Sequence, residues 1–315
     1  CRMIFRTLVL LSFAAAGTQP AGASEGSPFA DDLVSLGRAL FFDPRLSSDR
    51  TMSCSTCHDP ARAFTDARDN GVAGAASLGN DGKSLGDRNA PTLTYASLVP
   101  SFRERDDGTY EGGLFHDGRA ESLAAQASQP ITSPAEMALP VAGVLERIGE
   151  NSAYVDAFES LLGEQALRNP EAALESVAAA LAAYESSPEF STFDSKYDRY
   201  LRGEATLTRE ENLGRILFFS PLSNCNQCHL LDQREDQQRE TFTNHAYHNI
   251  GVPVNNRLRA ENGTRRGHID PGLAANPQVG NDMESGKYRV PSLRNVAVTG
   301  PYMHNGVFAD LETAI

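Results

Sequence analysis

The chain has 315 residues, of which 41 are acidic and 28 are basic, so its formal net charge at pH 7 is −13. An acidic chain of this kind argues against nucleic acid as a partner, because binding to phosphates requires a basic surface. The length is typical of two domains rather than one.

The N-terminal residues have the layout of a secretory signal peptide. Arg2 and Arg6 precede an apolar run over residues 8–16, and small residues follow up to Ala23. This order of a basic, an apolar and a small-residue region predicts cleavage after Ala23. No other stretch approaches the roughly 20 apolar residues that a membrane-spanning helix needs. The sequence therefore predicts a leader over residues 1–23 and an exported protein without a membrane span.

A nine-residue segment occurs twice, as LGRALFFDP at residues 36–44 and as LGRILFFSP at residues 213–221. The repeat indicates that two domains of one kind begin in the same way. Before the second copy, Thr208 and Glu211 form a capping-box pattern, which predicts a helix from about Arg209 to Phe219. The first copy predicts an equivalent helix that ends before Pro44.

Each copy of the repeat is followed by a C-x-x-C-H pentapeptide. In this motif two thiols on one turn can each add to a haem vinyl group, and the adjacent histidine can bind the iron. A zinc half-site or a thioredoxin-like pair is the alternative reading of C-x-x-C, but neither calls for an adjacent histidine in both copies. The sequence therefore predicts two covalently attached c-type haems, bound through Cys54, Cys57 and His58 and through Cys225, Cys228 and His229.

Helical patterns dominate the segment between the two motifs. Asn169 followed by Pro170 predicts a helix start, and an apolar stripe at helical spacing follows it, formed by Leu174, Val177, Leu181 and Tyr184. Residues 141–163 also have a helical pattern, whereas residues 66–88 and 255–282 have no sustained period and are predicted to be loops. We therefore expect a mostly α fold with two cytochrome c-like haem domains and extensive loops, over residues 24–203 and 204–315.

Four further motifs join the two haem motifs into a recognisable set: RNAPT at residues 88–92, LFHDGRA at 114–120, VPSLRN at 290–295 and GPYMHNG at 300–306. With these motifs the chain closely resembles the bacterial dihaem cytochrome c peroxidase and MauG family over nearly its whole length. The resemblance implies that the N-terminal haem, on His58, reacts with peroxide. The C-terminal haem, on His229, would relay electrons from an external donor.

The resemblance also implies the distal residues of the peroxidatic haem. The family's distal glutamine and glutamate correspond to Gln126 and Glu136, with Pro130 at the position of its distal proline. A carboxylate suits peroxide cleavage, because it can take a proton from the inner oxygen and return it to the leaving oxygen. The pattern Ser133 to Glu136 is also a capping box, so helix capping is the alternative role for Glu136.

Two positions depart from the family pattern. Some members have a distal histidine about sixteen residues after the first haem motif, where this chain has Gly74. The first haem is therefore expected to have an open sixth position in the resting state, as in MauG-like members. His116 stands where the family usually has a tryptophan between the haems, and either an inter-haem role or an ordinary packed histidine is consistent with that position.

The resemblance further implies a calcium ion between the haem domains, held by Asn89 and by the backbone carbonyls of Thr299 and Pro301, since calcium prefers oxygen ligands. The family's distal ligand of the second haem, a Met or Tyr, would fall a few residues beyond Ile315.

The resulting functional hypothesis is a periplasmic dihaem peroxidase that reduces hydrogen peroxide to water. Its electrons would come from a small periplasmic donor such as a cytochrome c or a cupredoxin. One alternative is a MauG-like enzyme that oxidises a protein side chain, and another is a dihaem electron-transfer cytochrome without peroxidase activity. The resemblance also allows a homodimer.

Overall fold

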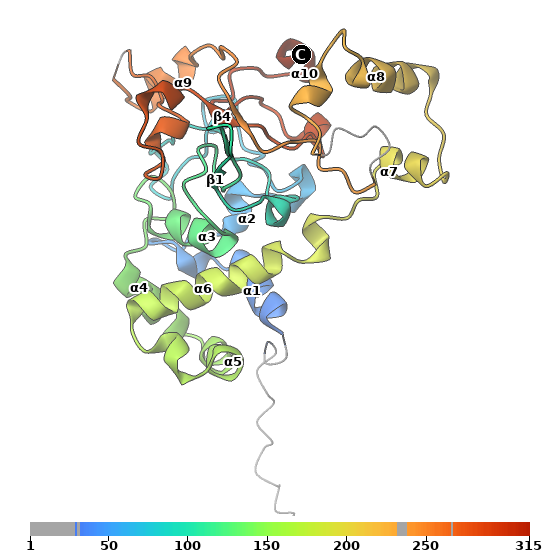
Figure 1. The fold of residues 1–315 in the computed structure, drawn as a ribbon. Helices are drawn as coiled ribbons and strands as arrows, with labels where there is room; N and C mark the ends of the chain where they lie inside the picture. Colours follow the sequence, from blue (N-terminus) through green and yellow to red (C-terminus); the bar gives the residue numbers. More distant parts are fainter. Residues whose placement is uncertain (1–28, 30–31, 232–237, 266) are drawn as a thin grey trace, which may run out of the picture.

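The computed structural model describes residue 29 and residues 32–231, 238–265 and 267–315, and the predicted leader lies outside this part of the chain. The regular structure of the described residues is almost entirely helical, with only short strands and with long loops between the helices, in agreement with the predicted mostly α fold class (Figure 1). The helices are α1 (Leu33–Phe41), α2 (Cys54–Cys57), α3 (Leu123–Thr132), α4 (Val141–Gly149), α5 (Ser152–Leu162), α6 (Pro170–Glu185), α7 (Lys196–Leu201), α8 (Arg209–Phe219), α9 (Asn256–Glu261) and α10 (Leu311–Ala314). Short strands form two antiparallel pairs, β1 (Arg103–Glu104) with β2 (Tyr110–Glu111) and β3 (Tyr247–His248) with β4 (Tyr288–Arg289).

Helix α6 is the centre of the main hydrophobic core, and α1, α3 and α4 all pack against it (Figure 1). It begins as predicted, because the Asn169 side chain accepts a hydrogen bond of 2.8 Å from the amide of Ala172, and Pro170 needs no partner for a missing N–H. The predicted apolar stripe faces the core, with Val177, Leu181 and Tyr184 almost fully buried. Each such burial contributes about 1.5–3 kcal/mol to folding.

Helix α1 crosses α6 at very close range, which requires a glycine. A Cβ atom on Gly37 would lie 1.9 Å from the carbonyl oxygen of Ala180, so no larger residue fits there. Phe41, at the end of α1, then packs its ring against Tyr184 and Phe190, with centroids 5.4 and 6.3 Å away. Phe64 packs against Phe41 and Phe190, and Cys54 lies against this cluster. The core therefore fixes the segment that contains the first haem motif.

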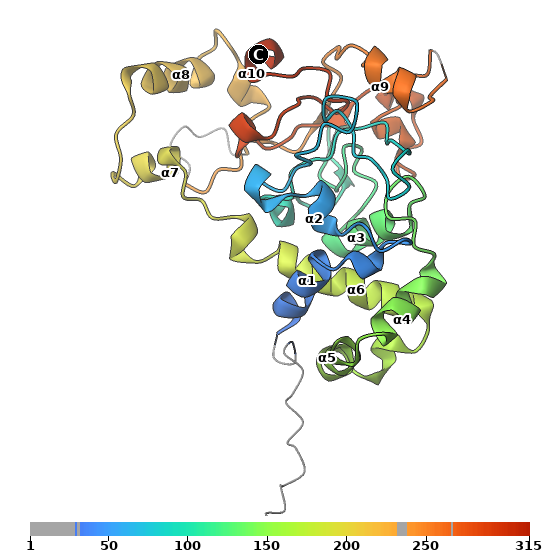
Figure 2. The ribbon, with the colours of Figure 1, turned by 180° about the vertical axis from the view of Figure 1, so that it is seen from behind.

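Helix α8, which precedes the second haem motif, lies on the opposite side of the molecule from α4 and α5 (Figures 1 and 2). Its bounds are those predicted, and the capping box is present: Thr208 N donates to Glu211 at 2.7 Å and Glu211 N donates to Thr208 at 3.2 Å. None of its described residues is buried, and Leu213 and Ile216 are 55% and 49% exposed. This helix is thus held by local capping rather than by a packed core of protein side chains.

A buried ion pair connects α7 to the C-terminal part of the chain. The guanidinium of Arg294 donates to Asp198 at 2.9 Å and to the carbonyl of Glu240 at 2.8 Å, and both charged side chains are at most 4% exposed. Arg294 also lies over the rings of Phe193 and Phe242. The motif at residues 290–295 therefore anchors α7 and the segment after the second haem motif to one another.

One predicted loop is partly helical. Residues 256–261 form α9, whose first turn is capped by the side chain of Asn255 through the amide of Leu258 at 3.1 Å. Six residues are too few for an apolar period to stand out, which is why the pattern missed them. Residues 66–88 contain no helix or strand, as predicted. Within the described ranges, no helix is both long enough and apolar enough to cross a membrane.

Candidate haem-binding site

The first C-x-x-C-H motif forms a tight helical turn. Ser53 N donates to the Thr56 side chain at 3.0 Å, and His58 N donates to the carbonyl of Cys54 at 3.0 Å. Cys54 and Cys57 are free thiols rather than a disulfide, the state in which each can add to a vinyl group. Burial raises the pKa of Cys57 to about 11, so that thiol is neutral at physiological pH.

The ring of His58 is oriented by a backbone carbonyl. Its Nδ1 lies 2.9 Å from the carbonyl oxygen of Phe64, so Nδ1 carries the proton and donates it. Burial lowers the pKa of His58, which keeps the imidazole neutral. A neutral ring with Nε2 unprotonated is the form that binds a metal. The chain therefore presents His58 in the protonation state and tautomer of a proximal ligand.

The second motif repeats this arrangement with a different local helix. Residues 225–227 form a 3-10 turn rather than an α-helical one, preceded by Asn224 in the left-handed region at φ 54°. His229 N donates to the carbonyl of Cys225 at 3.0 Å, and His229 Nδ1 lies 3.2 Å from the carbonyl oxygen of Phe242. Phe64 and Phe242 share the same unusual backbone, with φ of 57° and 56°. Both histidines are thus oriented in the same way.

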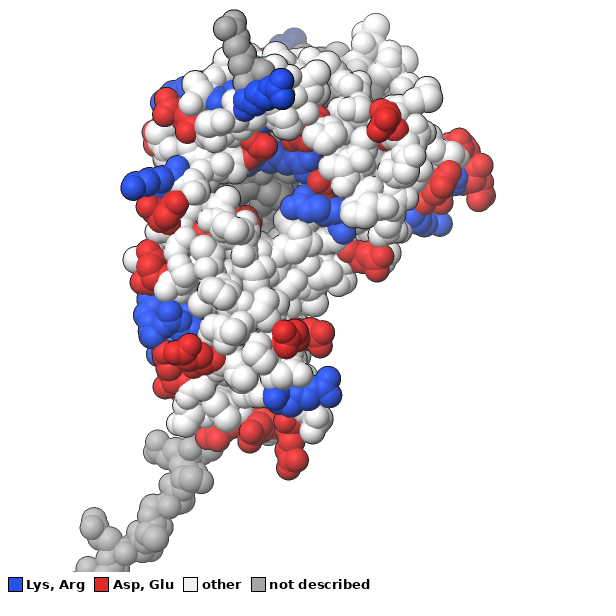
Figure 3. Space-filling model, turned by 90° about the vertical axis from the view of Figure 1, so that its left-hand side faces the viewer, with Lys and Arg blue, Asp and Glu red and all other residues white. Residues whose placement is uncertain are grey.

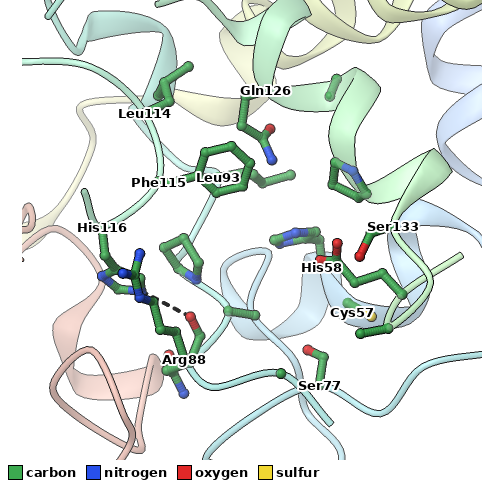
Figure 4. Close-up of a pocket in the computed structure, with 18 of the residues that line it drawn as sticks. Cys57, His58, Ser77, Arg88, Leu93, Leu114, Phe115, His116, Gln126 and Ser133 are labelled. Atoms are coloured by element: carbon green, nitrogen blue, oxygen red, sulfur yellow. Dashed lines mark hydrogen bonds between the residues drawn. The ribbon is translucent and has the colours of Figure 1, made fainter. Parts of the chain in front are cut away.

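A cavity of about 620 Å³ lies over the first motif (Figure 4). The free thiols Cys54 and Cys57, with His58, form one part of its wall, and apolar side chains form much of the rest, among them Leu93, Leu114, Phe115, Ile131 and Met137. Its size and largely apolar lining are those of a pocket for a large, flat, apolar cofactor. Space-filling shows a hollow on one side of the molecule with basic and acidic side chains beside it (Figure 3). The residues present therefore fit a covalently bound haem.

The two predicted distal residues line this same cavity. Gln126 and Pro130 come from α3, and Glu136 comes from the turn that follows it. In Figure 4 the Gln126 side chain points into the cavity that His58 also lines. The structure therefore brings His58 together with Gln126 and Glu136, although His58 is remote from both in the sequence.

The capping alternative for Glu136 is wrong. Ser133 is the C-cap that follows the last residue of α3, Thr132, and residues 134–137 form a turn rather than a new helix. Because no helix begins there, the Glu136 side chain is left to face the cavity. Burial raises the pKa of Glu136, and the nearby Ser133 hydroxyl and Arg119 oppose this only in part. A raised pKa makes the carboxylate a better proton acceptor, which suits a group that takes up a proton and then returns it.

His116 and Asn89 line the same cavity and contact each other. His116 Nε2 donates to the carbonyl oxygen of Asn89 at 3.0 Å, and burial lowers the pKa of His116 to about 4, so its ring is neutral. Asn89 N in turn donates to the carbonyl of His304 at 2.7 Å. Thr299 and Pro301 do not line this cavity, but Asn89 donates to the carbonyl of Gly74 at 3.3 Å, and a Cβ atom on Gly74 would lie 3.3 Å from Pro301. Of the predicted calcium ligands, two therefore lie near one another.

Sequence reasoning missed a charged network at the rim of the cavity. Arg88 donates to Asp270 at 2.6 and 2.7 Å and to Asp117 at 2.6 Å, and Arg119 donates to Asp117 at 2.9 Å. Burial would raise the pKa of Asp270, but Arg88 outweighs it and the pKa is about 2. Arg88 and Asp117 stand in the motifs that carry the resemblance, but their partner Asp270 is remote in sequence and lies in a stretch predicted to be a loop.

Sequence reasoning also missed Glu185, the last residue of α6. Its side chain lines the cavity near Cys54, and its Oε2 atom is buried with no hydrogen-bond partner among the described residues. Burial alone raises the pKa of Glu185 to about 8. Glu185 therefore adds a second protonatable group to the wall, on the side of the attachment cysteines.

Comparisons with known proteins agree with this site. The family model described as "Di-haem cytochrome c peroxidase" matches residues 31–206. The chain is 52% identical to the methylamine utilization protein MauG of Paracoccus denitrificans, over 96% of this chain and 76% of that protein. It is 30% identical to the cytochrome c551 peroxidase of Pseudomonas aeruginosa, over 92% of this chain and 72% of that protein.

Among solved structures, the diheme peroxidase BthA of Burkholderia thailandensis is similar, with a TM-score of 0.82 and 37% identity. This match covers 91% of the chain and 71% of BthA. The family of oxidoreductases matched by sequence is thus the one matched by structure. The chain, with its two C-x-x-C-H motifs for two haems, belongs to the di-haem cytochrome c peroxidase family.

Proposed function

We propose that the mature protein is a periplasmic peroxidase that reduces hydrogen peroxide to water with electrons from a small redox protein. The observation that carries this proposal is the common cavity of His58, Gln126 and Glu136. The leader over residues 1–23 would export the chain, and c-type haem is attached outside the cytoplasm. Residues 24–203 would form the peroxidatic domain and residues 204–315 the electron-transfer domain.

Each residue of the cavity has a definite role in this proposal. The haem, once bound, supplies the redox chemistry of peroxide cleavage, and the chain supplies ligation, access and protons. His58 would hold the iron through Nε2. Glu136 would take the proton from the inner peroxide oxygen and return it to the leaving oxygen, and Gln126 would orient the peroxide by a hydrogen bond.

Some family members have a distal histidine about sixteen residues after the first haem motif, and this chain has no histidine at that position. Gly74 stands there, with φ of 74°, and its carbonyl accepts a hydrogen bond from Asn89 at 3.3 Å. Without a histidine to leave the iron, the fully ferric protein would react with peroxide without prior reduction.

Electrons would enter singly at the His229 site and pass to the His58 site. His116 lines the cavity and is joined to the β4 segment, because His116 O accepts from Arg289 N at 2.9 Å, and would lie on the route between the sites. The chain's net charge of −13 favours a basic donor surface on a cytochrome c or a cupredoxin. A calcium ion at Asn89, Thr299 and Pro301 would stabilise the region between the haems.

A second candidate is oxidation of a protein side chain by the same site. The observation in its favour is the 52% identity to the methylamine utilization protein MauG, which exceeds the identity to the cytochrome c551 peroxidases. The two functions differ in where the electrons come from: a diffusible donor in the first, and a protein side chain in the second.

The test is an optical titration of the purified, fully ferric holoprotein with stoichiometric hydrogen peroxide. A rapid change in the Soret band supports an open, ungated site. A reaction that begins only after one haem is reduced would contradict the open sixth position. No reaction in either oxidation state would contradict the proposed peroxidase and favour an electron-transfer cytochrome without peroxidase activity. Turnover of peroxide with reduced cytochrome c or cupredoxin then separates the peroxidase from the side-chain oxidase.

A further inference from the structure

Arg289, on strand β4, is a cation of the haem cavity that has no carboxylate partner among the described residues. It lines the cavity with Arg88 and Arg119, and those two arginines form ion pairs with Asp117. The Nε atom of Arg289 is buried and has no hydrogen-bond partner in the described chain. The polar contact of its guanidinium is His245 Nδ1, 3.4 Å from Nη1. Arg289 thus differs from the other arginines of the cavity.

An unpaired guanidinium in such a place is costly. Burial of a charge without an opposite charge is strongly unfavourable, and arginine does not escape that cost by losing its proton, because its pKa is too high. The neighbouring side chains do not supply a negative charge. Burial lowers the pKa of His245 to about 4, so it is neutral, and the Tyr247 hydroxyl donates its proton to the carbonyl of Gly112 at 2.6 Å. The site therefore calls for an anion.

The backbone of Arg289 is fixed between the two haem motifs. Its N–H donates to the carbonyl of His116 at 2.9 Å, and β4 pairs with β3 through Tyr247. Two residues further on, the Pro291 carbonyl lies beside the ring of His229. The guanidinium is therefore held in the wall of the His58 cavity and close in sequence to the surroundings of His229.

We propose that Arg289 binds a haem propionate through its Nε and Nη atoms. A haem carries two carboxylates on one edge, and the planar fork of arginine matches a carboxylate in charge and geometry. Arg88 and Arg119 are already paired with aspartates, which leaves Arg289 to neutralise this edge. The inference rests on haem attachment at the two motifs and not on peroxide chemistry, so it can fail while the proposed function holds.

Arg289 is then a positioning residue. By holding a propionate, it would set the orientation of the haem edge next to His116, and its positive charge would favour the reduced state of that haem. Either the His58 haem or the His229 haem could supply the carboxylate, since β4 is connected to the surroundings of both.

The experiment compares Arg289→Gln, Arg289→Lys and the control Arg103→Gln in the dihaem holoprotein. The side chain of Arg103 is 70% exposed and does not line the cavity, and its partner Glu111 keeps a second arginine, Arg105, when Arg103 is replaced. The readouts are the propionate-bending bands in resonance Raman spectra and the midpoint potentials of both haems. Neither depends on turnover.

We expect Arg289→Gln to shift the propionate bands of one haem and to lower its midpoint potential, because a positive charge is lost. Arg289→Lys should restore much of the potential but not the band position, since lysine keeps the charge and lacks the fork. Arg103→Gln should change neither. The same spectra in a Cys225→Ser, Cys228→Ser background, which keeps only the His58 haem, identify the haem concerned.

Unchanged bands and potentials for both haems in Arg289→Gln would overturn the proposal and leave Arg289 as a structural cation. If the Arg289→Gln variant does not acquire both haems, the spectra of the Arg289→Lys variant test the proposal instead. A band shift in that variant supports propionate binding, and wild-type bands contradict it.

Discussion

The Nδ1 atom of His58 lies 2.9 Å from the carbonyl oxygen of Phe64, and the chain uses the same device at His229 with Phe242. Because a backbone carbonyl accepts from Nδ1, the other nitrogen of each ring is the one available to iron. The orientation of both rings is thus set by the fold before any iron is bound. Local backbone geometry at the two phenylalanines, with φ near 57°, makes this possible.

Replacing both thiols of one motif should remove one haem and leave the other. We expect Cys54→Ser, Cys57→Ser to lower the haem absorbance per protein in the pyridine haemochrome assay by about half, because each motif provides its own two thiols. The matched control is Cys225→Ser, Cys228→Ser, which should lose the same amount. Only the first variant should also lose the reaction with peroxide. Two haems in either variant would show that the changed motif is not an attachment site.

Replacing Glu136 by glutamine should slow the reaction with peroxide by a factor of about 10² to 10⁴, because the amide cannot carry the proton. Stopped-flow mixing of the ferric protein with peroxide measures this rate. The matched control is Glu146→Gln, since Glu146 is exposed on α4 and does not line the cavity. A wild-type rate in Glu136→Gln would exclude Glu136 as the proton carrier.

The same residue should give the rate a pH dependence. Burial raises the pKa of Glu136, so its carboxylate is lost at a higher pH than that of a free glutamate. As the pH falls through this raised pKa, the base becomes protonated and the rate should fall. Glu136→Gln should lack this acid limb and Glu146→Gln should keep it. An identical acid limb in both variants would assign the titration to another group.

Replacing His116 by alanine should slow electron transfer between the haems, because alanine removes the ring that lines the cavity and its hydrogen bond from Nε2 to the carbonyl of Asn89. The measurement is the rate at which an electron delivered to the His229 haem reaches the His58 haem after rapid reduction. His248→Ala is a suitable control, since His248 is exposed. If the rate in His116→Ala equals that of the wild type, the side chain is dispensable.

Removing calcium should weaken communication between the haems. Asn89 contacts His116 through its carbonyl and donates to the carbonyl of His304, so a change at this position reaches both sides of the cavity wall. We expect one bound calcium by elemental analysis, a change in a haem spectrum on thorough chelation, and weaker calcium binding in Asn89→Ala. Chelation that neither removes calcium nor alters either haem spectrum would show that the site does not exist.

Replacing Asp198 by asparagine should destabilise the protein by about 3–5 kcal/mol, because it leaves the guanidinium of Arg294 buried without its partner. Asp194→Asn is the control: Asp194 pairs with Arg202, but its side chain is 60% exposed, and such surface pairs contribute about 1 kcal/mol or less. Denaturant unfolding of the holoproteins measures both. Equal losses in the two variants would contradict this account.

The ion pair of Asp198 with Arg294 should also make the free energy of unfolding depend on pH. Burial would raise the pKa of Asp198, but the hydrogen bonds from Arg294 and Ser195 outweigh burial and lower it. The pair therefore stabilises the fold above the pKa of an unfolded aspartate, about 4, and this stabilisation is lost as the pH falls toward the lower folded value.

The features that could be predicted from the sequence are those fixed by neighbouring residues. The bounds of α8 and the start of α6 followed from capping residues within four positions of each other. The sequence did not predict that the two haem motifs have different turns. The second turn is 3-10 rather than α-helical, and Asn224, in the left-handed region, precedes it. The six residues of α9 were too few to show a period.

The candidate site was predictable only where a known family has the same motifs. Gln126 and Glu136 were located by that resemblance, whereas the two possible roles of Glu136 could be separated only by seeing that α3 ends at Thr132. Arg88 and Asp270 are 182 residues apart, and no local pattern joins such a pair. Buried partners remote in sequence depend on the tertiary fold, which a motif search does not supply.

The wall of the His58 cavity includes Asp270, Pro271, Ala275 and Arg289, which all come from the second half of the chain. The halves that carry the two haem motifs are therefore not interchangeable modules. A hybrid that joined the first half of this protein to the second half of a distant relative would inherit a foreign wall around its own proximal histidine. Homologous recombination within the family should thus succeed only between members that match on both sides of this shared surface.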